Sequence, residues 1–319
     1  MAGWLIVNEY LNTEKFKELT DLFLKAADSK GVDLQVYTNA ELVVDYETGE
    51  ACSRAFENGR PDFVIFYDKD ISLALALENM GLDVFNSANA IETCDSKALT
   101  AECVCAFNRE VMDEGLSHEA LVKMPLTFKV PFTYENIGIN KDANFEFLGY
   151  VEKRLTEKCG SPYPVIIKES YSSFGMGVHL ANSREEVIEL LCKVGNKECV
   201  IQEFIKSAAG TDVRLQMVGD NLVAAMKRTN ENDFRSNITN GGHMSDYEVT
   251  QLDLELAMKV MRCLGLDFAG IDIIHDEGGK PIFIEANSNA HFKNLYDLTG
   301  INVAEEMLEY INHSICEPI

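Results

Sequence analysis

The sequence contains no apolar run of the roughly 18 residues that a membrane-spanning helix needs. Residues 1–8 lack a basic segment followed by a long apolar one, so we expect no signal peptide there. The 46% hydrophobic and 25% charged residues are ordinary for a soluble globular protein. We therefore expect a cytoplasmic protein without a membrane partner.

Basic residues are scarce. The 319 residues include 28 Lys plus Arg against 52 Asp plus Glu, which gives a formal net charge of −24. Nucleic-acid binding needs a clustered basic surface, so this balance argues against a nucleic-acid partner. If an anionic substrate binds here, a few local cations and a metal ion must reverse the field inside a cleft.

Motifs for zinc binding and for covalent catalysis are also missing. There are nine cysteines but no Cys-x-x-Cys pair, which favours reduced and mostly buried thiols. No histidine pair has metal-ligand spacing, and no Ser/His/Asp or Cys/His arrangement stands out. His243, beside a glycine loop, and His291 remain candidates to face a cleft.

The length favours two or three subdomains around a shared site. In residues 1–96, short apolar runs such as 63–67 alternate with helical periodicity, which predicts a small α/β domain with a parallel sheet. Asn12 or Thr13 is expected to cap its first helix. A long helix is predicted over 248–264. Its apolar residues Leu252, Leu256 and Val260 lie on one side.

A tight hairpin is predicted near the C-terminus. Gly278-Gly279 lies between two β-rich runs, a strong signal for a two-residue turn. Folding the chain about that pair places Glu277 opposite Lys280. Counting outward then places Asp272 opposite Glu285.

Opposed carboxylates repel each other and destabilise a hairpin unless a cation lies between them. Mg²⁺ prefers carboxylate and amide oxygens together with substrate phosphates, and Asn287 shares the strand face of Glu285. The apolar neighbours, including Ile271 and Ile284, predict that the other face is core. The alternative is an exposed face that is acidic because the whole protein is acidic.

A phosphate-binding loop is predicted after Lys168. The segment Ser170–Gly177 is rich in small residues and contains two glycines, so its N–H groups can approach phosphate oxygens closely. Walker and Rossmann loops open a helix, whereas a strand over 178–181 follows here. The loop is therefore expected to be a hairpin tip that folds over a triphosphate, and a plain surface turn is the alternative.

Two further groups of residues suggest nucleotide and anion binding. The apolar strand Val200–Ile205 is suited to pair with an adenine edge, although buried strands of this kind are common. Arg214, Arg228 and Arg235 carry guanidinium groups, which bind carboxylates and phosphates bidentately and suit an acyl phosphate. Surface ion pairs are the alternative for each arginine.

Together these blocks resemble the ATP-grasp superfamily, and within it the RimK-type ligases that add glutamate to ribosomal-protein or small-molecule carboxylates. The resemblance runs from about Phe85 to the C-terminus. Its motifs are Cys94–Lys97, the Lys168 strand with its Ser-Phe-Gly-x-Gly loop, Gln202–Ile205, Asp212–Arg214, Asp233–Asn237 and Asp272 with Glu285-x-Asn287.

The resemblance implies an ATP-grasp fold, α/β overall and α+β in its ATP-binding part. We expect an N-terminal α/β domain over 1–96, a central lid subdomain over 97–198 and a C-terminal subdomain over 199–319. It also implies ATP and Mg²⁺ or Mn²⁺ as cofactors, and a homodimer or homotetramer is plausible by family likeness.

The resemblance further implies residue roles. The residues expected to bind ATP are Lys97, Lys168, Ser173, Phe174, Gly175, Gly177, Gln202, Glu203, Phe204, Ile205, Asp212 and Arg214. Those expected to bind the metal are Asp272, Glu285 and Asn287. Those expected to act in catalysis are Arg228, Arg235 and Asn237, of which Arg228 and Arg235 would hold the acyl phosphate or the substrate carboxylate.

The implied activity is that of an ADP-forming acid–amino-acid ligase. A carboxylate attacks the γ-phosphate, ADP leaves, and an amine displaces phosphate, with positioning and charge neutralisation as the main catalytic effects. The substrates would be an amino acid, a small peptide or a protein tail. A macrocyclising ligase of a ribosomally made precursor peptide and a non-catalytic ATP-binding regulator are the alternatives.

Two regions depart from the family pattern. After Asn287 the relatives continue with Ser-Pro-Gly, whereas Ser288-Asn289-Ala290-His291 stands here. The segment 117–150 is longer and more aromatic than expected, and within it 124–150 is either a substrate-facing loop or an extra strand pair. Both regions are expected to border the acceptor pocket, so the identity of the substrates stays open.

Overall fold

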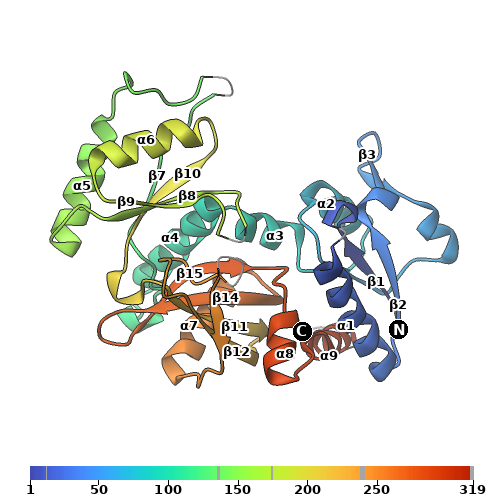
Figure 1. The fold of residues 1–319 in the computed structure, drawn as a ribbon. Coiled ribbons are helices and arrows are strands. Elements are labelled where there is room, and N and C mark those ends of the chain that lie inside the picture. The colour runs from blue at the N-terminus through green and yellow to red at the C-terminus, as the bar shows by residue number, and fades with distance from the viewer. Residues whose placement is uncertain (12, 135–136, 174, 238–240, 317–319) are drawn as a thin grey trace.

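The computed structural model describes residues 1–11, 13–134, 137–173, 175–237 and 241–316. It has a mixed α/β architecture, as predicted, and the described residues form three main sheets. In Figure 1 the N-terminal part lies to the right, the central sheet with its helices lies at the upper left, and the C-terminal sheet lies below.

The N-terminal sheet is parallel, with strand order β2-β1-β5-β6. Its strands are β1 (Ala2–Val7), β2 (Asp33–Thr38), β5 (Phe63–Phe66) and β6 (Val84–Phe85). All four residues of β5 are buried, as a parallel strand covered on both faces requires. The small hairpin of β3 (Val43–Asp45) and β4 (Glu50–Cys52) was not predicted.

Helices cover this sheet and link it to the rest of the molecule. They are α1 (Glu14–Lys30), α2 (Ile71–Asn79), α3 (Ala88–Asp95) and α4 (Lys97–Asp113). Thr13 is the N-cap residue of α1, whereas Asn12 lies outside the described residues. Gly31 ends α1 in the left-handed region, with φ of 67°, which is the usual role of glycine after a helix.

The central sheet is antiparallel, with order β7-β10-β8-β9. Its strands are β7 (Thr127–Lys129), β8 (Val165–Glu169), β9 (Val178–Ala181) and β10 (Cys199–Glu203), and its helices are α5 (Glu146–Cys159) and α6 (Arg184–Val194). The described residues of segment 124–150 supply one strand, β7, and the start of α5, and no strand pair. Phe132 and Tyr134 in this segment are exposed.

The C-terminal sheet has order β13-β12-β11-β14-β15, with antiparallel neighbours. Its strands are β11 (Thr211–Val218), β12 (Asn221–Thr229), β13 (His243–Ser245), β14 (Phe268–His275) and β15 (Pro281–Asn287), and its helices are α7 (Gln251–Leu264), α8 (Lys293–Thr299) and α9 (Val303–Cys316). In α7, Leu256 and Val260 are buried as expected, but Leu252 is 52% exposed, so its predicted place on the apolar side was wrong.

The first and last parts of the chain share one core. Phe23 of α1 and Phe63 of β5 pack in the same buried cluster as Phe268, Phe292 and Met307 of the C-terminal part. Helix α1 accordingly lies beside α8 and α9 (Figure 1). Strand β10 belongs to the central sheet although it begins at residue 199, where we placed the start of the C-terminal subdomain. The three-part division of the chain remains a proposal.

All nine cysteines are free, but only Cys94 and Cys199 are buried, so the expectation of mostly buried thiols was wrong. Cys105 and Cys159 are exposed because the helical period places them on solvent-facing sides of α4 and α5.

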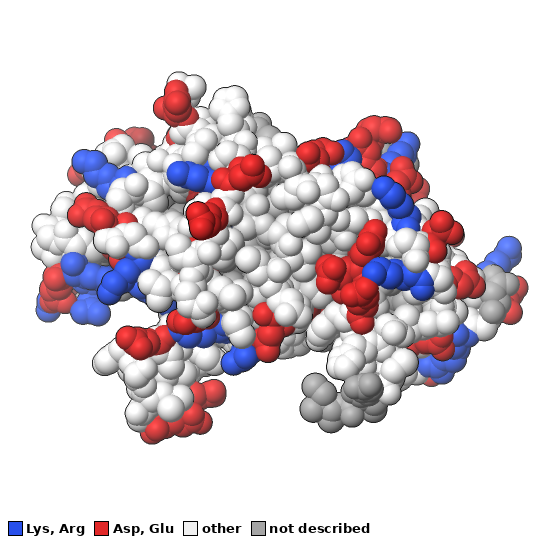
Figure 2. Space-filling model, turned by 90° about the horizontal axis from the view of Figure 1, so that it is seen from below, with Lys and Arg blue, Asp and Glu red and all other residues white. Residues whose placement is uncertain are grey.

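None of the described helices has the length and apolar character needed to cross a bilayer. On the face drawn in Figure 2, the basic side chains of the described residues lie among acidic ones and form no continuous basic track.

Candidate active site

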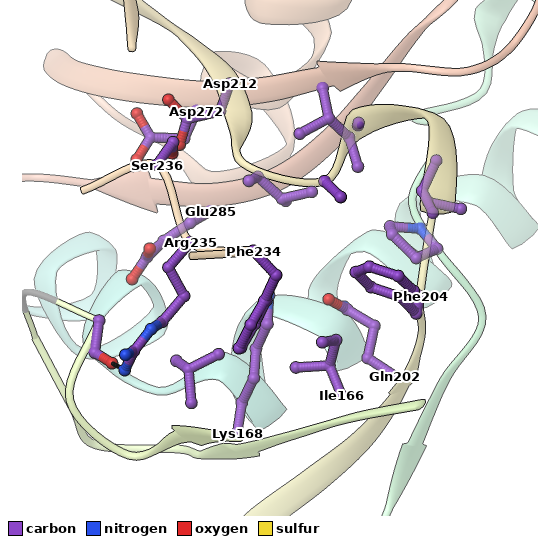
Figure 3. A pocket seen from close by; sticks show the side chains of 18 of the residues that line it. Ile166, Lys168, Gln202, Phe204, Asp212, Phe234, Arg235, Ser236, Asp272 and Glu285 are labelled. Atoms are coloured by element: carbon purple, nitrogen blue, oxygen red, sulfur yellow. Dashed lines mark hydrogen bonds between the residues drawn. The ribbon is translucent and has the colours of Figure 1, made fainter. Parts of the chain in front are cut away.

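A cavity of about 130 Å³ lies between the central and C-terminal sheets. Figure 3 shows that its two ends differ in character. Asp212, Asp272 and Glu285 lie at one end, whereas Phe204 and Gln202 lie at the other. The cavity is therefore charged at one end and largely apolar at the other, as a nucleotide with a polyphosphate and a flat base requires.

The carboxylates of the charged end come from the β14–β15 hairpin. Asp272 pairs directly with Glu285 across the two strands, as predicted. The predicted turn was wrong, however, because His275 pairs with Pro281 and a five-residue connection, 276–280, joins the strands. A bulge between Phe283 and Glu285 then restores the Asp272 pairing.

The bulge changes the direction of one side chain. Ile284 was expected in the core together with Ile271, and Ile271 is indeed fully buried. Ile284 instead lines the cavity together with Ile274, while Phe283 takes the core position. An extra residue in one strand moves the side chains that follow it to the opposite face of the sheet. A prediction from the two-residue period of a regular strand cannot include this change.

Asp272 is the centre of a buried ion-pair network. Arg214 Nε and Nη2 donate to its two oxygens at 2.7 Å each, and Arg228 Nη2 lies 2.9 Å from Oδ2. Arg228 also donates twice to Asp212 at 2.6 Å. Burial opposes ionisation of Asp272, but the charges of Arg214 and Arg228 outweigh it and hold its pKa below the ordinary value.

Two lysines face these carboxylates from the other side. Lys97, at the start of α4, lies 3.5 Å from Glu285 Oε1 and donates to the backbone oxygen of Ser172 at 2.8 Å. The ammonium group of Lys168, near the end of β8, makes no hydrogen bond or ion pair with any described residue. Burial lowers its pKa to about 8. An anionic ligand would supply the partner that Lys168 lacks among these residues.

The predicted phosphate loop is the tip of the β8–β9 hairpin, as expected, with Lys168 opposite Val178. The loop is tied to two other parts of the molecule. Arg235 Nη1 donates to the backbone oxygen of Gly175 at 3.0 Å, and Lys69 donates to Ser173 Oγ at 3.2 Å. Phe174, which we predicted to bind ATP, lies outside the described residues.

The apolar end is built from β10 and the loop after β12. Phe204 meets Phe234 edge-on, with ring centroids 6.3 Å apart. The Glu203 carboxylate accepts hydrogen bonds from the backbone N–H of Leu126 and the Lys158 ammonium, at 2.9 and 3.0 Å. Its carboxylate is thus already occupied, so Glu203 would meet a base mainly through its backbone.

Most of the predicted residues lie on the wall of this cavity. They are Lys97, Lys168, Gly175, Gln202, Glu203, Phe204, Ile205, Asp212, Arg228, Arg235, Asn237, Asp272 and Glu285. Ser173, Gly177, Arg214 and Asn287 line a second, adjoining cavity instead. Their roles stay predictions, because placement on a wall does not test a function.

Several lining residues were not among the predicted site residues. Ile166 lies two positions before Lys168 on β8, so the strand period could have revealed that both face the same side. Phe234 and Ser236 belong to the Asp233–Asn237 run, in which only alternate residues were chosen. Ile274 and Ile284 reach the cavity through hairpin geometry that the sequence does not show.

The second cavity is a groove of about 1270 Å³ between the N-terminal part and the C-terminal sheet. One wall consists of α1 and the loops after β1 and β5, and the other includes Asn289, Ala290 and His291. Four residues line both cavities: Ser172, Arg228, Asn237 and Glu285. The charged end of the first cavity therefore opens into the groove.

The oxygen donors at this junction suit Mg²⁺, which binds proteins through one or two carboxylates and leaves room for phosphates. Among the described residues the Glu285 carboxylate makes one ion pair, with Lys97. Asp272 Oδ1 accepts one arginine bond and keeps a lone pair, whereas Oδ2 already meets both Arg214 and Arg228. The buried Asn287 Nδ2 also lacks a partner among them, and as an N–H donor it could bind a phosphate oxygen but not the metal. Within the described part of the chain, no group of three His, Cys, Asp or Glu could hold a metal by itself, so a bound phosphate would have to help.

Comparison with known proteins assigns the chain to a family. A model described as the RimK-like ATP-grasp domain matches residues 119–311. The chain belongs to the RimK-like ATP-grasp family, whose members are carboxylate–amine ligases.

Two relatives illustrate the range of the family. The chain is 28% identical over 297 residues to the uncharacterized MG012 homolog of Mycoplasma pneumoniae, covering 92% of each protein. It is 38% identical over 152 residues to the ribosomal protein bS6–L-glutamate ligase of Escherichia fergusonii, covering 46% of this chain and 50% of that one.

Solved structures show the same fold. The D-alanine–D-alanine ligase of Bacillus anthracis superimposes with a TM-score of 0.66 at 14% identity, over 99% of this chain and 97% of that one. A RimK-domain ATP-grasp protein of Sphaerobacter thermophilus gives 0.66 at 16% identity, over 97% and 99%. At these identities the likeness establishes the fold, and ATP-grasp architecture accounts for nearly the whole chain.

Proposed function

We propose that this protein is an ADP-forming ligase that joins the carboxylate of an amino acid, a small peptide or a protein tail to an amine. The carboxylate oxygen attacks the γ-phosphorus of ATP, ADP leaves, and the amine nitrogen then displaces phosphate from the acyl carbon. One proton of the amine leaves with the phosphate, so the amide, ADP and phosphate account for all atoms.

The observation that carries this proposal is the junction of the two cavities. A phosphoryl group held at the charged end of the small cavity would face the groove directly, between Arg228, Asn237 and Glu285. A carboxylate lying in the groove could therefore reach it without leaving the protein. A plain ATP-binding protein would have no need for this opening.

The apolar end would hold the adenine between Ile166 and the rings of Phe204 and Phe234. The amide of Gln202 is held by Thr127, with Nε2 donating to Oγ1 at 2.9 Å, so its oxygen is oriented as an acceptor. Lys168 and Lys97 then provide positive charge along the path to the metal ligands.

Arg228 is suited to hold the group that is transferred. Its Nε and Nη2 are fixed by Asp212 and Asp272, while its Nη1 has no bond to a described residue. A guanidinium fixed in this way needs little reorganisation when charge develops nearby, which is the basis of electrostatic catalysis.

Glu285 and Asp272, with the amide oxygen of Asn287, would hold Mg²⁺. When bound, the metal would neutralise phosphate charge and orient the γ-phosphate for in-line attack. The acidic network would then serve the reaction as well as the fold. A buried ion pair adds little net stability compared with apolar residues of similar volume, so stability alone does not explain it.

The decisive experiment combines ATP, Mg²⁺ and a panel of the twenty amino acids, glutamate-rich peptides and a lysine-containing peptide. We expect substrate-dependent release of ADP and phosphate and a product mass equal to the sum of both substrates minus water. With ¹⁸O in the substrate carboxylate, one label should appear in the released phosphate. Release of AMP and pyrophosphate, or no turnover with any member of the panel, would overturn the proposal.

A further inference from the structure

The N-terminal parallel sheet presents the carboxyl ends of its strands to the large groove. Strand β1 lies between β2 and β5. From β1 the chain forms β2 on one side of it and later returns to form β5 on the other side. Open α/β sheets bind ligands at such a point, outside the carboxyl ends of the two strands. Asn8 directly follows β1, and Asp68 follows β5 after one residue, so both lie at this position.

Asp68 is a buried carboxylate whose hydrogen bonds are incomplete. Its side chain is only 3% exposed, and Oδ1 accepts a hydrogen bond of 2.9 Å from Asn8 Nδ2. Oδ2 has no partner among the described residues. The neighbouring Lys69 ammonium donates to Asp95 and Ser173 rather than to this oxygen. Burial raises the pKa of Asp68, against the hydrogen bonds from Asn8 and the backbone of Lys69.

A second incomplete acceptor lies on the opposite wall. The Nε2 atom of His291 is 2.7 Å from the backbone oxygen of Lys15. A carbonyl oxygen can only accept, so Nε2 carries the proton and Nδ1 is an acceptor. Nδ1 is buried and has no partner among the described residues. Burial lowers the pKa of His291 to about 4, so the ring is neutral near pH 7.

The two walls are held together next to these residues. Tyr67 Oη donates to the backbone oxygen of Ala290 at 2.5 Å, and Tyr67 and Ala290 are the chain neighbours of Asp68 and His291. Phe16 packs edge-on against the His291 ring, with centroids 5.6 Å apart. Both unpartnered atoms accept hydrogen bonds, so the complementary ligand is a donor, and one of the two acceptors carries negative charge.

We propose that the groove binds a primary ammonium group of the substrate at Asp68 and His291, across the ends of β1 and β5. This assignment rests on the proposed ligase function. An ammonium group carries three donors and one positive charge, which matches a carboxylate oxygen and an imidazole nitrogen. The group belongs either to the attacking amine or to the amino acid whose carboxylate is activated.

The test uses the variant Asp68→Asn, with Asp83→Asn as the matched control, because Asp83 is exposed on the same domain and away from the groove. We expect Asp68→Asn to raise the KM of the ammonium-bearing substrate by about 10- to 100-fold while the KM of ATP stays within about twofold. Asp83→Asn should behave as the wild type. An unchanged KM for every substrate in Asp68→Asn would overturn the proposal.

Hydroxylamine distinguishes the two sources of the ammonium group. It is largely neutral near neutral pH and traps an acyl phosphate as a hydroxamate without needing an ammonium site. If Asp68 binds the attacking amine, Asp68→Asn keeps the wild-type rate of hydroxamate formation and loses amide formation. If Asp68 binds the activated amino acid, the KM of that acid rises in the hydroxamate assay as well.

His291→Gln provides an independent test from the other wall, since it leaves the Asn8–Asp68 pair intact. We expect the same KM to rise about 5-fold. Melting temperatures and the KM of ATP show whether each variant is folded. If the wild type forms neither ADP nor hydroxamate with any panel member, the proposed ligase function fails. If the wild type is active and both variants keep its KM values, only the ammonium site fails.

Discussion

The guanidinium group of Arg214 donates one hydrogen bond of 2.7 Å to each oxygen of Asp272. A carboxylate in the proposed metal site is therefore already paired with a fixed cation. Glu285, directly opposite on β15, has among the described residues only the longer ion pair with Lys97, at 3.5 Å, and is 34% exposed at its side chain. The two carboxylates face the same ligand but differ in what each contributes to the fold.

This difference predicts that removing either charge lowers activity, whereas only removal of the Asp272 charge lowers stability strongly. Glu285→Gln should lower Mg²⁺-dependent turnover by about 100-fold or more and change the free energy of unfolding by less than about 1 kcal/mol. Asp272→Asn should also lose activity, but it leaves Arg214 and Arg228 short of a buried partner. It should therefore lose about 3–5 kcal/mol of stability. Urea unfolding and Mg²⁺ titration of turnover measure the two quantities, and equal stability losses would contradict the assignment.

The pairing of Asp272 with Glu285 was predicted correctly from the sequence because two errors cancel. The turn was predicted too short, and the bulge at Ile284 was not predicted. A type I′ turn needs positive φ at both central residues, and only Gly279, at 73°, has it. Asp276 Oδ1 instead accepts hydrogen bonds of 2.9 Å from the N–H groups of Gly278 and Lys280, which stabilises a wider connection. The bulge at Ile284 then returns the register to the predicted pairing.

Lys168 predicts how nucleotide affinity depends on pH. Its pKa of about 8 in the free protein is lowered by burial, so the charged form is lost as pH rises through 8. Bound phosphates favour the charged form, so the apparent Kd of Mg–ATP should be flat below about pH 7, about twofold weaker at pH 8 and about tenfold weaker near pH 9. Isothermal titration at several pH values measures it.

Lys168→Arg is the control for this titration. Arginine stays charged throughout the range, so the dependence above pH 8 should disappear in the variant even if its overall affinity is lower. An equally steep dependence in Lys168→Arg would assign the effect to another group.

The contact between Arg235 and Gly175 predicts a change in the mobility of the phosphate loop. Arg235 is oriented by Asp233 and holds the loop through one bond of 3.0 Å to a backbone oxygen. Arg235→Ala should let a protease cut within 170–177 severalfold faster and weaken protection by nucleotide, since fewer contacts close the loop. Arg262→Ala, which removes an exposed ion pair with Asp220, should leave the cleavage rate unchanged. Identical cleavage in both variants would contradict this role.

The sequence revealed the nucleotide end of the site better than the substrate end. Lys168 and its loop, or Asp233 to Asn237, are continuous segments whose local pattern indicates their chemistry. Asp68 and His291 instead line the same groove from distant parts of the chain. Their neighbours Tyr67 and Ala290, 223 positions apart, are joined by one hydrogen bond. The packing of α1 on the C-terminal helices brings these parts of the chain together, and no local sequence pattern indicates that packing.

Asp253 predicts a pH-dependent contribution to stability far from the chemistry. This carboxylate is fully buried at the start of α7 and accepts hydrogen bonds from Thr250, Tyr247 and His275. Burial opposes its ionisation, but these bonds outweigh that effect and lower its pKa to about 2. A depressed carboxyl pKa stabilises the fold above the unfolded pKa of about 4, and the contribution fades as pH falls towards 2.

We therefore expect Asp253→Asn to lower the free energy of unfolding by roughly 2 kcal/mol at pH 7, with a smaller difference at pH 3. Asparagine retains the shape and part of the hydrogen bonding, so the lost charge accounts for most of the change. Urea unfolding of both proteins between pH 7 and pH 3 measures it, with the exposed Asp83→Asn as the control. A difference that stays constant across this range would show that Asp253 stabilises α7 by its hydrogen bonds alone, because only a charge effect can disappear when the carboxyl group takes up a proton.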